Sequence, residues 1–359
     1  MHDSGCRMEM VHIDGSYGEG GGQVLRTSLS LAALLGCDLE ITGIRAGRPK
    51  PGLAAQHVTC VRAAAAVCSA EVRGDEVNSG QVAFRPGKLQ AGDYLFDVSD
   101  VRSSAGSVSL VLQTVLPPLL FAGAPSRVVL RGGTNVPWSP PFEYLGHVFL
   151  PTIRRMGAEC TLERTRGGWY PAGGGEIVAR ICPIQRPLRP LSLTDRGDLR
   201  SLEAVTTVSD RLPEHIAQRQ LQGALQELPT QVSRLARRTT HRPEGGPGTA
   251  VLLAGTWESG QAGASALGQR GKPAEQVGAE AGEEFRAFIE SGAAVDTHLA
   301  DQLLLYAALA EETSRYTAQE RTLHLDTNAW VIHQFLGDRV VIGGDGPAEV
   351  SVEGIGLGA

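Results

Sequence analysis

The sequence predicts an α/β fold of the α+β kind, with three repeated helix-sheet units forming a large domain and a smaller inserted α/β domain. Three observations predict it: the length of 359 residues, a helical run leading into a β-branched strand that recurs six times, and one stretch that breaks this rhythm. A chain of this length exceeds the size at which a single hydrophobic core stops growing, so more than one structural unit is expected.

The six helix-strand runs fall into three successive pairs. Each run has apolar residues near helical spacing, then a glycine or turn, then alternating strand residues. The pairs cover residues 22–44 with 54–74, 104–133 with 142–165, and 301–327 with 328–346. Similar units in succession indicate internal repeats, and short helix-strand links favour helices that pack on a sheet.

The regular succession of helix-strand runs is interrupted between the second and third pairs. This stretch has its own strand-helix pattern, including a predicted amphipathic helix that starts at Pro213 and Glu214. We therefore expect three parts: residues 1–184 with the first two repeats of the large domain, an inserted small domain at 185–281, and the third repeat at 282–359.

Composition and charge are those of a globular protein rich in turns, with 42% hydrophobic residues, 20% charged residues and 45 glycines. The net charge of -6 argues against broad coating of nucleic acid but leaves room for a local basic pocket. The sequence has no apolar run of membrane-spanning length and no signal-peptide order at its start, so we expect a cytoplasmic protein that does not contact a membrane.

The cysteines are widely spaced, without a C-x-x-C pair, and we expect reduced thiols in the core. They are Cys6, Cys37, Cys60, Cys68, Cys160 and Cys182.

A glycine-rich loop stands between a predicted strand at Met8–Asp14 and a predicted helix at Gln23–Leu35, which Gly36 ends. Such a loop directs free N–H groups at an anion near the positive end of the helix, so phosphate is the natural ligand. The loop is not a Walker A motif, and Gln23 stands where G-x-G-x-x-G requires its last glycine.

Charged residues surround this loop. Glu19 would repel phosphate unless a divalent cation lies between them, which makes it either a metal ligand or a solvated turn carboxylate. Arg26 lies in the first helical turn. A second basic cluster, which is either a phosphate site or an exposed turn, follows in a turn-rich loop and at a helix start. Its members are Arg45, Arg48, Lys50, Gln56 and His57.

Two histidines compete for the chemistry. His298 shares one face of a predicted helix with Asp301 and Gln302, and Asp296 or Thr297 caps this helix. This face could bind metal, contact a nucleotide or be an ordinary solvated helix start.

The other histidine, His324, alternates with leucines and is predicted on the polar face of a strand, before a helix capped by Thr327 or Asn328. Near a helix N-terminus it would stay neutral and nucleophilic, although a lone histidine more often has only a structural role. The pattern alone does not choose between the two histidines.

Together these segments resemble the RNA 3'-terminal phosphate cyclases over nearly the whole chain. The resemblance is carried by "DGSYGEGGGQVLRTSLSLA", "IRAGRPKPGLAAQH", "SAGSVSLVLQTVLP", "GGWYPAGGGEI", "HLADQLLLYAALA" and "HLDTN", in the family's order. It implies a ligase that forms a phosphoric ester bond. A histidine attacks ATP, pyrophosphate leaves, AMP passes to an RNA 3'-phosphate, and the 2'-hydroxyl displaces AMP to give a 2',3'-cyclic phosphate.

The resemblance also implies roles for individual residues. His324 matches the adenylylated histidine, and Glu19 matches the ligand of a divalent metal, Mg²⁺ or Mn²⁺, that accompanies ATP. The nucleotide-binding positions are Gln113, His298, Leu299, Ala300, Asp301 and Gln302. The polar cluster near the phosphates and the RNA end is Arg26, Arg45, Arg48, Gln56 and His57. Some family members carry tyrosine where this chain has His298, and imidazole stacks more weakly on a base.

Two rival interpretations remain at the level of sequence. One is a catalytically inactive relative that acts in ribosome assembly, although such relatives lack the nucleophilic histidine. The other is an enolpyruvyl transferase built on a related repeat. Besides an RNA with a 3'-phosphate end, a second copy of the chain is a candidate partner.

Overall fold

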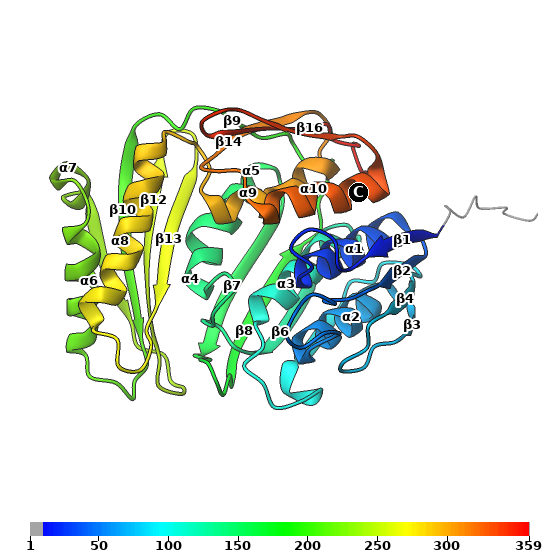
Figure 1. Cartoon of the computed structure of the whole chain (residues 1–359), viewed down its shortest axis with the longest axis horizontal. Helices are drawn as coiled ribbons and strands as arrows, with labels where there is room; N and C mark the ends of the chain where they lie inside the picture. The colour runs from blue at the N-terminus through cyan, green and yellow to red at the C-terminus, as the bar shows by residue number, and fades with distance from the viewer. Residues whose placement is uncertain (1–9, 359) are drawn as a thin grey trace, which may run out of the picture.

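The computed structural model describes residues 10–358 and contains four four-stranded sheets with helices packed on them (Figure 1). The first sheet lies at one end of the molecule and the inserted sheet, with α6 and α8, at the other (Figure 1). The predicted α/β class is confirmed. Within the described residues, no helix is both long and apolar enough to cross a membrane.

Three of the sheets have the same strand order. Their orders are β1-β2-β4-β3, β5-β6-β8-β7 and β9-β14-β16-β15, and in each the first two strands are parallel while the other pairs are antiparallel. Apart from the insertion and a short 3-10 turn at Val98–Asp100, one helical segment lies between the first two strands of each sheet along the chain, and another between the second and third. We propose that this shared topology is the structural counterpart of the predicted sequence repeats.

The first sheet contains the glycine-rich loop. Helix α1 is apolar on most of its surface and ends at Gly36, whose φ of 67° is left-handed, as the sequence predicted. The predicted first strand begins at Val11, while Met8 lies outside the described residues. The elements are β1 (Val11–Asp14), α1 (Gly22–Leu35), β2 (Leu39–Thr42), α2 (Ala55–Cys68), β3 (Glu71–Arg73) and β4 (Val82–Arg85).

The second sheet has a long helical segment, residues 142–155, between β6 and β7. This 142–155 helix is α-helical at both ends and has a π-helical turn, η2, in the middle. The elements are β5 (Asp93–Asp97), the 3-10 turn η1 (Val98–Asp100), α3 (Val108–Leu120), β6 (Ser126–Gly132), α4 (Phe142–Tyr144), η2 (Leu145–Phe149), α5 (Leu150–Arg155), β7 (Glu159–Arg166) and β8 (Gly175–Cys182).

The third sheet begins with a short strand and resumes after the insertion. Its helix α9 begins after the buried Asp296, whose carboxylate accepts from the N–H groups of His298 and Leu299, so the predicted cap at Asp296 is confirmed. The elements are β9 (Ser192–Leu193), α9 (Thr297–Leu309), β14 (Ser314–Ala318), α10 (Leu323–Leu336), β15 (Val340–Gly343) and β16 (Ala348–Val352).

The inserted sheet has a hydrophobic core of its own. Along β10, Leu202 and Ala204 face this second core while Val205 faces the main one, because alternate strand residues point to opposite sides. The elements are β10 (Leu199–Val208), α6 (His215–Gln226), α7 (Thr230–Ser233), β11 (Ala236–His241), β12 (Thr249–Trp257), β13 (Gln261–Leu267) and α8 (Ala274–Ser291).

The division into 1–184, 185–281 and 282–359 stays a proposal. Helix α8 crosses residue 281, and β9 pairs with β14 of the third sheet. The elements that share the second core therefore run from β10 to α8.

The cysteine prediction needs one correction. Cys37, Cys60, Cys68 and Cys160 are free and buried, as expected, but Cys182 is free and exposed. It is the last residue of β8 and lies on the same side of the strand as the exposed Arg180, because side chains two positions apart share a face. Cys6 lies outside the described residues.

Candidate active site

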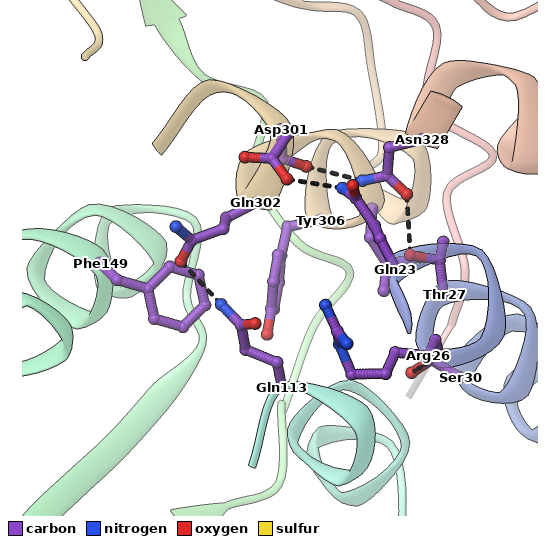
Figure 2. A pocket seen from close by; sticks show the side chains of 11 residues that line it. Gln23, Arg26, Thr27, Ser30, Gln113, Phe149, Asp301, Gln302, Tyr306 and Asn328 are labelled. Carbon is purple, nitrogen blue, oxygen red and sulfur yellow. Dashed lines mark hydrogen bonds between the residues drawn. The ribbon is translucent and has the colours of Figure 1, made fainter. Parts of the chain in front are cut away.

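The candidate site is a pocket where helices from all three units of the large domain meet. It is lined by α1, α3, α9, α10 and the 142–155 helix (Figure 2). The lining residues are Gln23, Arg26, Thr27, Ser30, Gln113, Phe149, Asp301, Gln302, Leu305, Tyr306 and Asn328.

Helix α1 turns a polar stripe toward this pocket. Gln23, Arg26, Thr27 and Ser30 stand at i, i+3, i+4 and i+7, so they share one face of the helix. The remaining surface of α1 is mostly buried and apolar. The helix therefore holds polar groups in fixed positions against a rigid core.

His324 lies in the first turn of helix α10, and the predicted strand at this position is wrong. The N-cap is Thr322, whose hydroxyl accepts from the N–H of Leu325 at 3.1 Å, so Thr327 and Asn328 are inside the helix. The alternation of Leu323 and Leu325 resembled a strand, but Leu323 is 57% exposed and only Leu325 packs in the core.

The imidazole of His324 is oriented by groups from the glycine loop and α1. Its Nδ1 lies 2.6 Å from Gln23 Oε1 and 3.3 Å from Glu19 Oε2. The side chain is 54% exposed, so the rest of the ring is open to an approaching molecule.

A chain of hydrogen bonds fixes Gln23 in turn. Its Nε2 donates to Asp301 Oδ2 at 2.5 Å, and Asn328 Nδ2 donates to the Asp301 carbonyl at 2.7 Å (Figure 2). Thr27 Oγ1 then donates to Asn328 Oδ1 at 2.8 Å (Figure 2). Helices α1, α9 and α10 are thus joined through buried polar groups, and burial raises the pKa of Asp301.

The glycine loop packs directly on α10. The N–H of Glu19 donates to Thr327 Oγ1 at 3.2 Å, and this hydroxyl donates to the Leu323 carbonyl at 2.6 Å. Gly18 has a φ of 61°, and a Cβ there would overlap the hydroxyl of Thr327. The close approach brings the loop, and the free N–H groups at the start of α1, beside His324.

Three of the predicted basic residues gather beneath the loop. Arg48 forms an ion pair with Glu19 and also donates to its carbonyl at 3.2 Å. Burial lowers the pKa of the half-buried Arg26, while Cys60, Asp301 and Glu19 counteract this effect. His57 is 5% exposed, and burial together with Arg26 and Arg45 lowers its pKa to about 3.

Two other predicted residues are engaged further from the pocket. Arg45 donates from Nη1 to the Gly52 carbonyl at 2.8 Å. Gln56 accepts from the N–H of Ser107 at 3.0 Å and so connects α2 to the start of α3. Neither side chain lines the pocket.

The predicted nucleotide segment on α9 is divided between pocket, core and surface. Gln302 lines the pocket and accepts from Gln113 Nε2 at 2.8 Å. Leu299 and Ala300 are buried in the main core and do not line the pocket.

His298 is exposed. Its Nε2 lies 3.2 Å from Glu284 Oε1, a hydrogen bond that raises the pKa of His298 to about 9. Of the three residues predicted to share one face of this helix, Asp301 and Gln302 line the pocket and His298 does not.

At the glycine loop a metal ion would find the carboxylate of Glu19. Among residues 10–358, no group of three His, Cys, Asp or Glu side chains is arranged to hold a metal. Mg²⁺ usually keeps several waters and needs only one or two carboxylates when substrate phosphates supply other ligands. Glu19 therefore fits a cation that arrives with phosphate ligands.

Sequence reasoning missed several residues of the site. Gln23 was considered only as a missing glycine, and Thr27, Ser30 and Tyr306 were not singled out. The polar stripe on the apolar helix α1 could have revealed the first three, since four polar residues at i, i+3, i+4 and i+7 mark one face.

Comparison with known proteins assigns the class. The model of the family "RNA 3'-terminal phosphate cyclase" matches residues 17–342, a span that contains the glycine loop, the basic cluster and His324. The chain is thus an enzyme of the cyclase type. It belongs to the RNA 3'-terminal phosphate cyclase family.

Curated relatives agree along nearly their full lengths. The chain is 46% identical to RNA 3'-terminal phosphate cyclase of Methylococcus capsulatus over 91% of both chains. It is 42% identical to the protein of that name from Pyrobaculum aerophilum, over 96% of this chain and 99% of the relative. Among solved structures, the enolpyruvyl transferase NikO from Streptomyces tendae overlaps 48% of this chain and 33% of its own, with 16% identity and a TM-score of 0.27, which is too little to support an argument.

Proposed function

We propose that this enzyme uses ATP to convert the 3'-phosphate end of an RNA into a 2',3'-cyclic phosphate through a histidine-AMP intermediate. His324 attacks the α-phosphorus of ATP and pyrophosphate leaves. The RNA 3'-phosphate then takes AMP from the histidine. Finally the adjacent 2'-hydroxyl attacks the activated phosphorus, loses its proton and expels AMP.

The observation that carries the proposal is the hydrogen bond between His324 and Gln23. The amide nitrogen of Gln23 donates to Asp301, so its oxygen faces His324 Nδ1 and accepts a hydrogen bond from the N–H there. A proton on Nδ1 leaves the lone pair on Nε2, which is the nucleophilic nitrogen. Asp301 and Gln23 therefore act as positioning residues that select the tautomer.

The surroundings of His324 suit a triphosphate. The free N–H groups at the start of α1 favour an anion, and Arg26 and Arg48 supply positive charge. A divalent cation bound with ATP would screen phosphate charge beside Glu19. In this structure Glu19 forms an ion pair with Arg48. When the cation contacts Glu19, Arg48 would leave the carboxylate and contact a phosphate oxygen instead.

The remaining predicted residues receive roles consistent with their positions. Gln113 of α3 and Asp301 and Gln302 of α9 line the pocket and offer amides and a carboxylate to a nucleotide. His298, Leu299 and Ala300 flank that segment. Arg45, Gln56 and His57 stay proposed as residues near the phosphates and the RNA end. A homodimer and a cytoplasmic location stay predictions.

The test is covalent labelling by α-labelled ATP with Mg²⁺ or Mn²⁺. We expect the wild-type enzyme to take up label that is acid-labile and alkali-stable, as a phosphoramidate is. The variant His324→Ala should take up none, while His298→Ala should still be labelled, since His298 lies outside the pocket and pairs with Glu284.

Other outcomes would redirect the proposal. Folded wild-type enzyme without label would favour the inactive ribosome-assembly interpretation. Label that survives His324→Ala but disappears in His298→Ala would show that the nucleophile is His298 on α9.

A further inference from the structure

A second pocket is lined by the same 142–155 helix as the candidate active site. Phe149 of this helix lines the first pocket, while Gly146, His147 and Leu150 line the second. The second cavity has a volume of about 330 Å³ and is completed by Phe142, Glu143, Arg154, Cys160, Thr161, Leu162 and His241. Because Phe149 of the first pocket and Leu150 of the second are consecutive residues, the two pockets are close neighbours.

The carboxylate in this pocket is already fully engaged. Glu143 is 4% exposed, and its Oε1 accepts from Arg164 and from Thr207 while Oε2 accepts from Asn135 at 2.6 Å. The guanidinium of Arg164 also lies 4.8 Å from the centre of the Phe142 ring. The negative charge of Glu143 is therefore neutralised inside the wall and does not repel an anion in the cavity.

The other ionisable groups of the lining, apart from the buried thiol, are basic. Arg154 is exposed, and within the described residues the only hydrogen bond of its side chain is a long one of 3.5 Å to the Cys160 carbonyl. His147 enters from η2, and His241 enters from the end of β11, on the inserted sheet. Burial first, and then Arg164 and His147, lower the pKa of His241 while Glu143 counteracts them, so the ring offers a hydrogen-bond donor and not a charge at neutral pH.

We propose that the second pocket binds the phosphodiester backbone of the RNA a few nucleotides upstream of the reacting end. This inference rests on the proposed function, which places the 3'-phosphate beside His324. Arginine and histidine donors at the edge of a cavity suit phosphate oxygens, and such contacts position an RNA without reading its sequence. The net charge of the whole chain is negative, but phosphate binding needs only the basic groups of this pocket, so the net charge does not oppose the proposal.

The test compares a short and a long substrate. We expect the double variant Arg154→Gln/His241→Gln to raise the KM for a 12-nucleotide RNA with a 3'-phosphate by about tenfold. The KM for a dinucleotide 3'-phosphate and the labelling by ATP alone should stay unchanged. The salt dependence of binding to the long RNA should become shallower, since fewer phosphates are neutralised.

The control is Arg180→Gln, which removes an exposed arginine of the same unit that pairs with Glu163 at 3.3 Å, outside the second pocket. It should leave the KM for both RNAs unchanged. Equal increases for the short and the long RNA in the double variant would overturn the inference, and so would no increase for either.

A binding measurement separates this inference from the proposed function. Fluorescence anisotropy with a 12-nucleotide RNA that ends in a 3'-hydroxyl does not depend on cyclisation. If wild-type enzyme binds this RNA and the double variant does not, the second pocket is an RNA site even if the labelling experiment fails. If wild-type enzyme does not bind it, the inference is wrong.

Discussion

His57, which stays proposed to bind substrate, also supports the glycine loop from beneath. Its Nδ1 accepts from the N–H of Ala54 at 3.0 Å, and its ring lies against the loop so closely that a Cβ on Gly22 would be 2.5 Å from Nε2. With a pKa of about 3, the ring is neutral at physiological pH. Positive charge under the loop therefore comes from the arginines alone.

This burial has a consequence for stability against acid. In the unfolded chain His57 has the ordinary pKa of about 6.5, so below that pH the unfolded state takes up a proton that the folded state does not. The contribution of neutral His57 to the free energy of unfolding is complete above pH 6.5 and is lost as the pH falls toward 3. When the pH is lowered from 7 to 5, the free energy of unfolding of the wild-type enzyme should fall by about 2 kcal/mol more than that of His57→Gln.

Urea unfolding at the two pH values measures this difference. The comparison uses only the change between pH 7 and pH 5, so a general loss of stability in the variant cancels. Equal changes in the two proteins would mean that His57 is accessible to protons in the folded state.

At the same scale, the sequence identified some residues of the site and missed others for physical reasons. Glu19, Arg26, Arg48 and His324 could be predicted because a glycine loop and the resemblance pointed to them. The polar stripe on α1 could have pointed to Gln23 as well, but its hydrogen bond could not be predicted, since the partner Asp301 is 278 residues away. Sequence patterns report neighbours along the chain, and this contact is made only by packing α1 on α9.

At the scale of elements, the start of α1 leaves little room for an added side chain. A Cβ on Gly22 would lie 2.5 Å from His57 Nε2 and 2.7 Å from Arg26 Nη1. Neither neighbour has room to retreat freely, because His57 is buried and Arg26 is partly buried.

We therefore expect Gly22→Ala to displace Arg26 and reduce the rate of labelling by ATP by at least about tenfold. The matched control is Gly47→Ala, where an added Cβ meets no atom within 4 Å. Circular dichroism should show that both variants are folded. Normal labelling of Gly22→Ala would show that the loop adapts to a side chain at this position.

Element boundaries were predictable where a local capping residue sets them. Gly36 ends α1 and Asp296 begins α9, as expected from the sequence. The start of α10 was predicted wrongly because a leucine on each side of His324 gives the same alternation in a strand and in a first helical turn. The choice is made by tertiary contact, since only Leu325 of the two is buried.

At the scale of the whole molecule, one buried cluster joins the inserted sheet to the large domain. Glu143 on the 142–155 helix contacts Arg164 on β7 and Thr207 on β10. Arg164 and Glu143 side chains are only 7% and 4% exposed, so each charge depends on the other for compensation. Sequence reasoning expected an insertion but could not locate its contact, because the partners come from three distant segments.

Removing one member of this pair should be costly. We expect Glu143→Gln to lower the free energy of unfolding by about 3–5 kcal/mol, because Arg164 is left as an uncompensated buried charge. Urea unfolding at neutral pH measures the loss. The matched variant Glu163→Gln breaks a pair with Arg180 in which both side chains are more than half exposed, and should cost about 1 kcal/mol or less. Similar losses in the two variants would show that the Glu143 pair is hydrated in solution.

The hydrogen bond between Gln23 and His324 joins residues that are 301 positions apart in the chain. A ribosome completes the glycine loop early and reaches the histidine only after the inserted sheet and α9 have been made. A nascent chain therefore has the groups proposed to hold phosphate long before it has a nucleophile. Under the proposed function, ATP can be consumed only by a molecule whose synthesis has passed α10, and fragments that end earlier are inert.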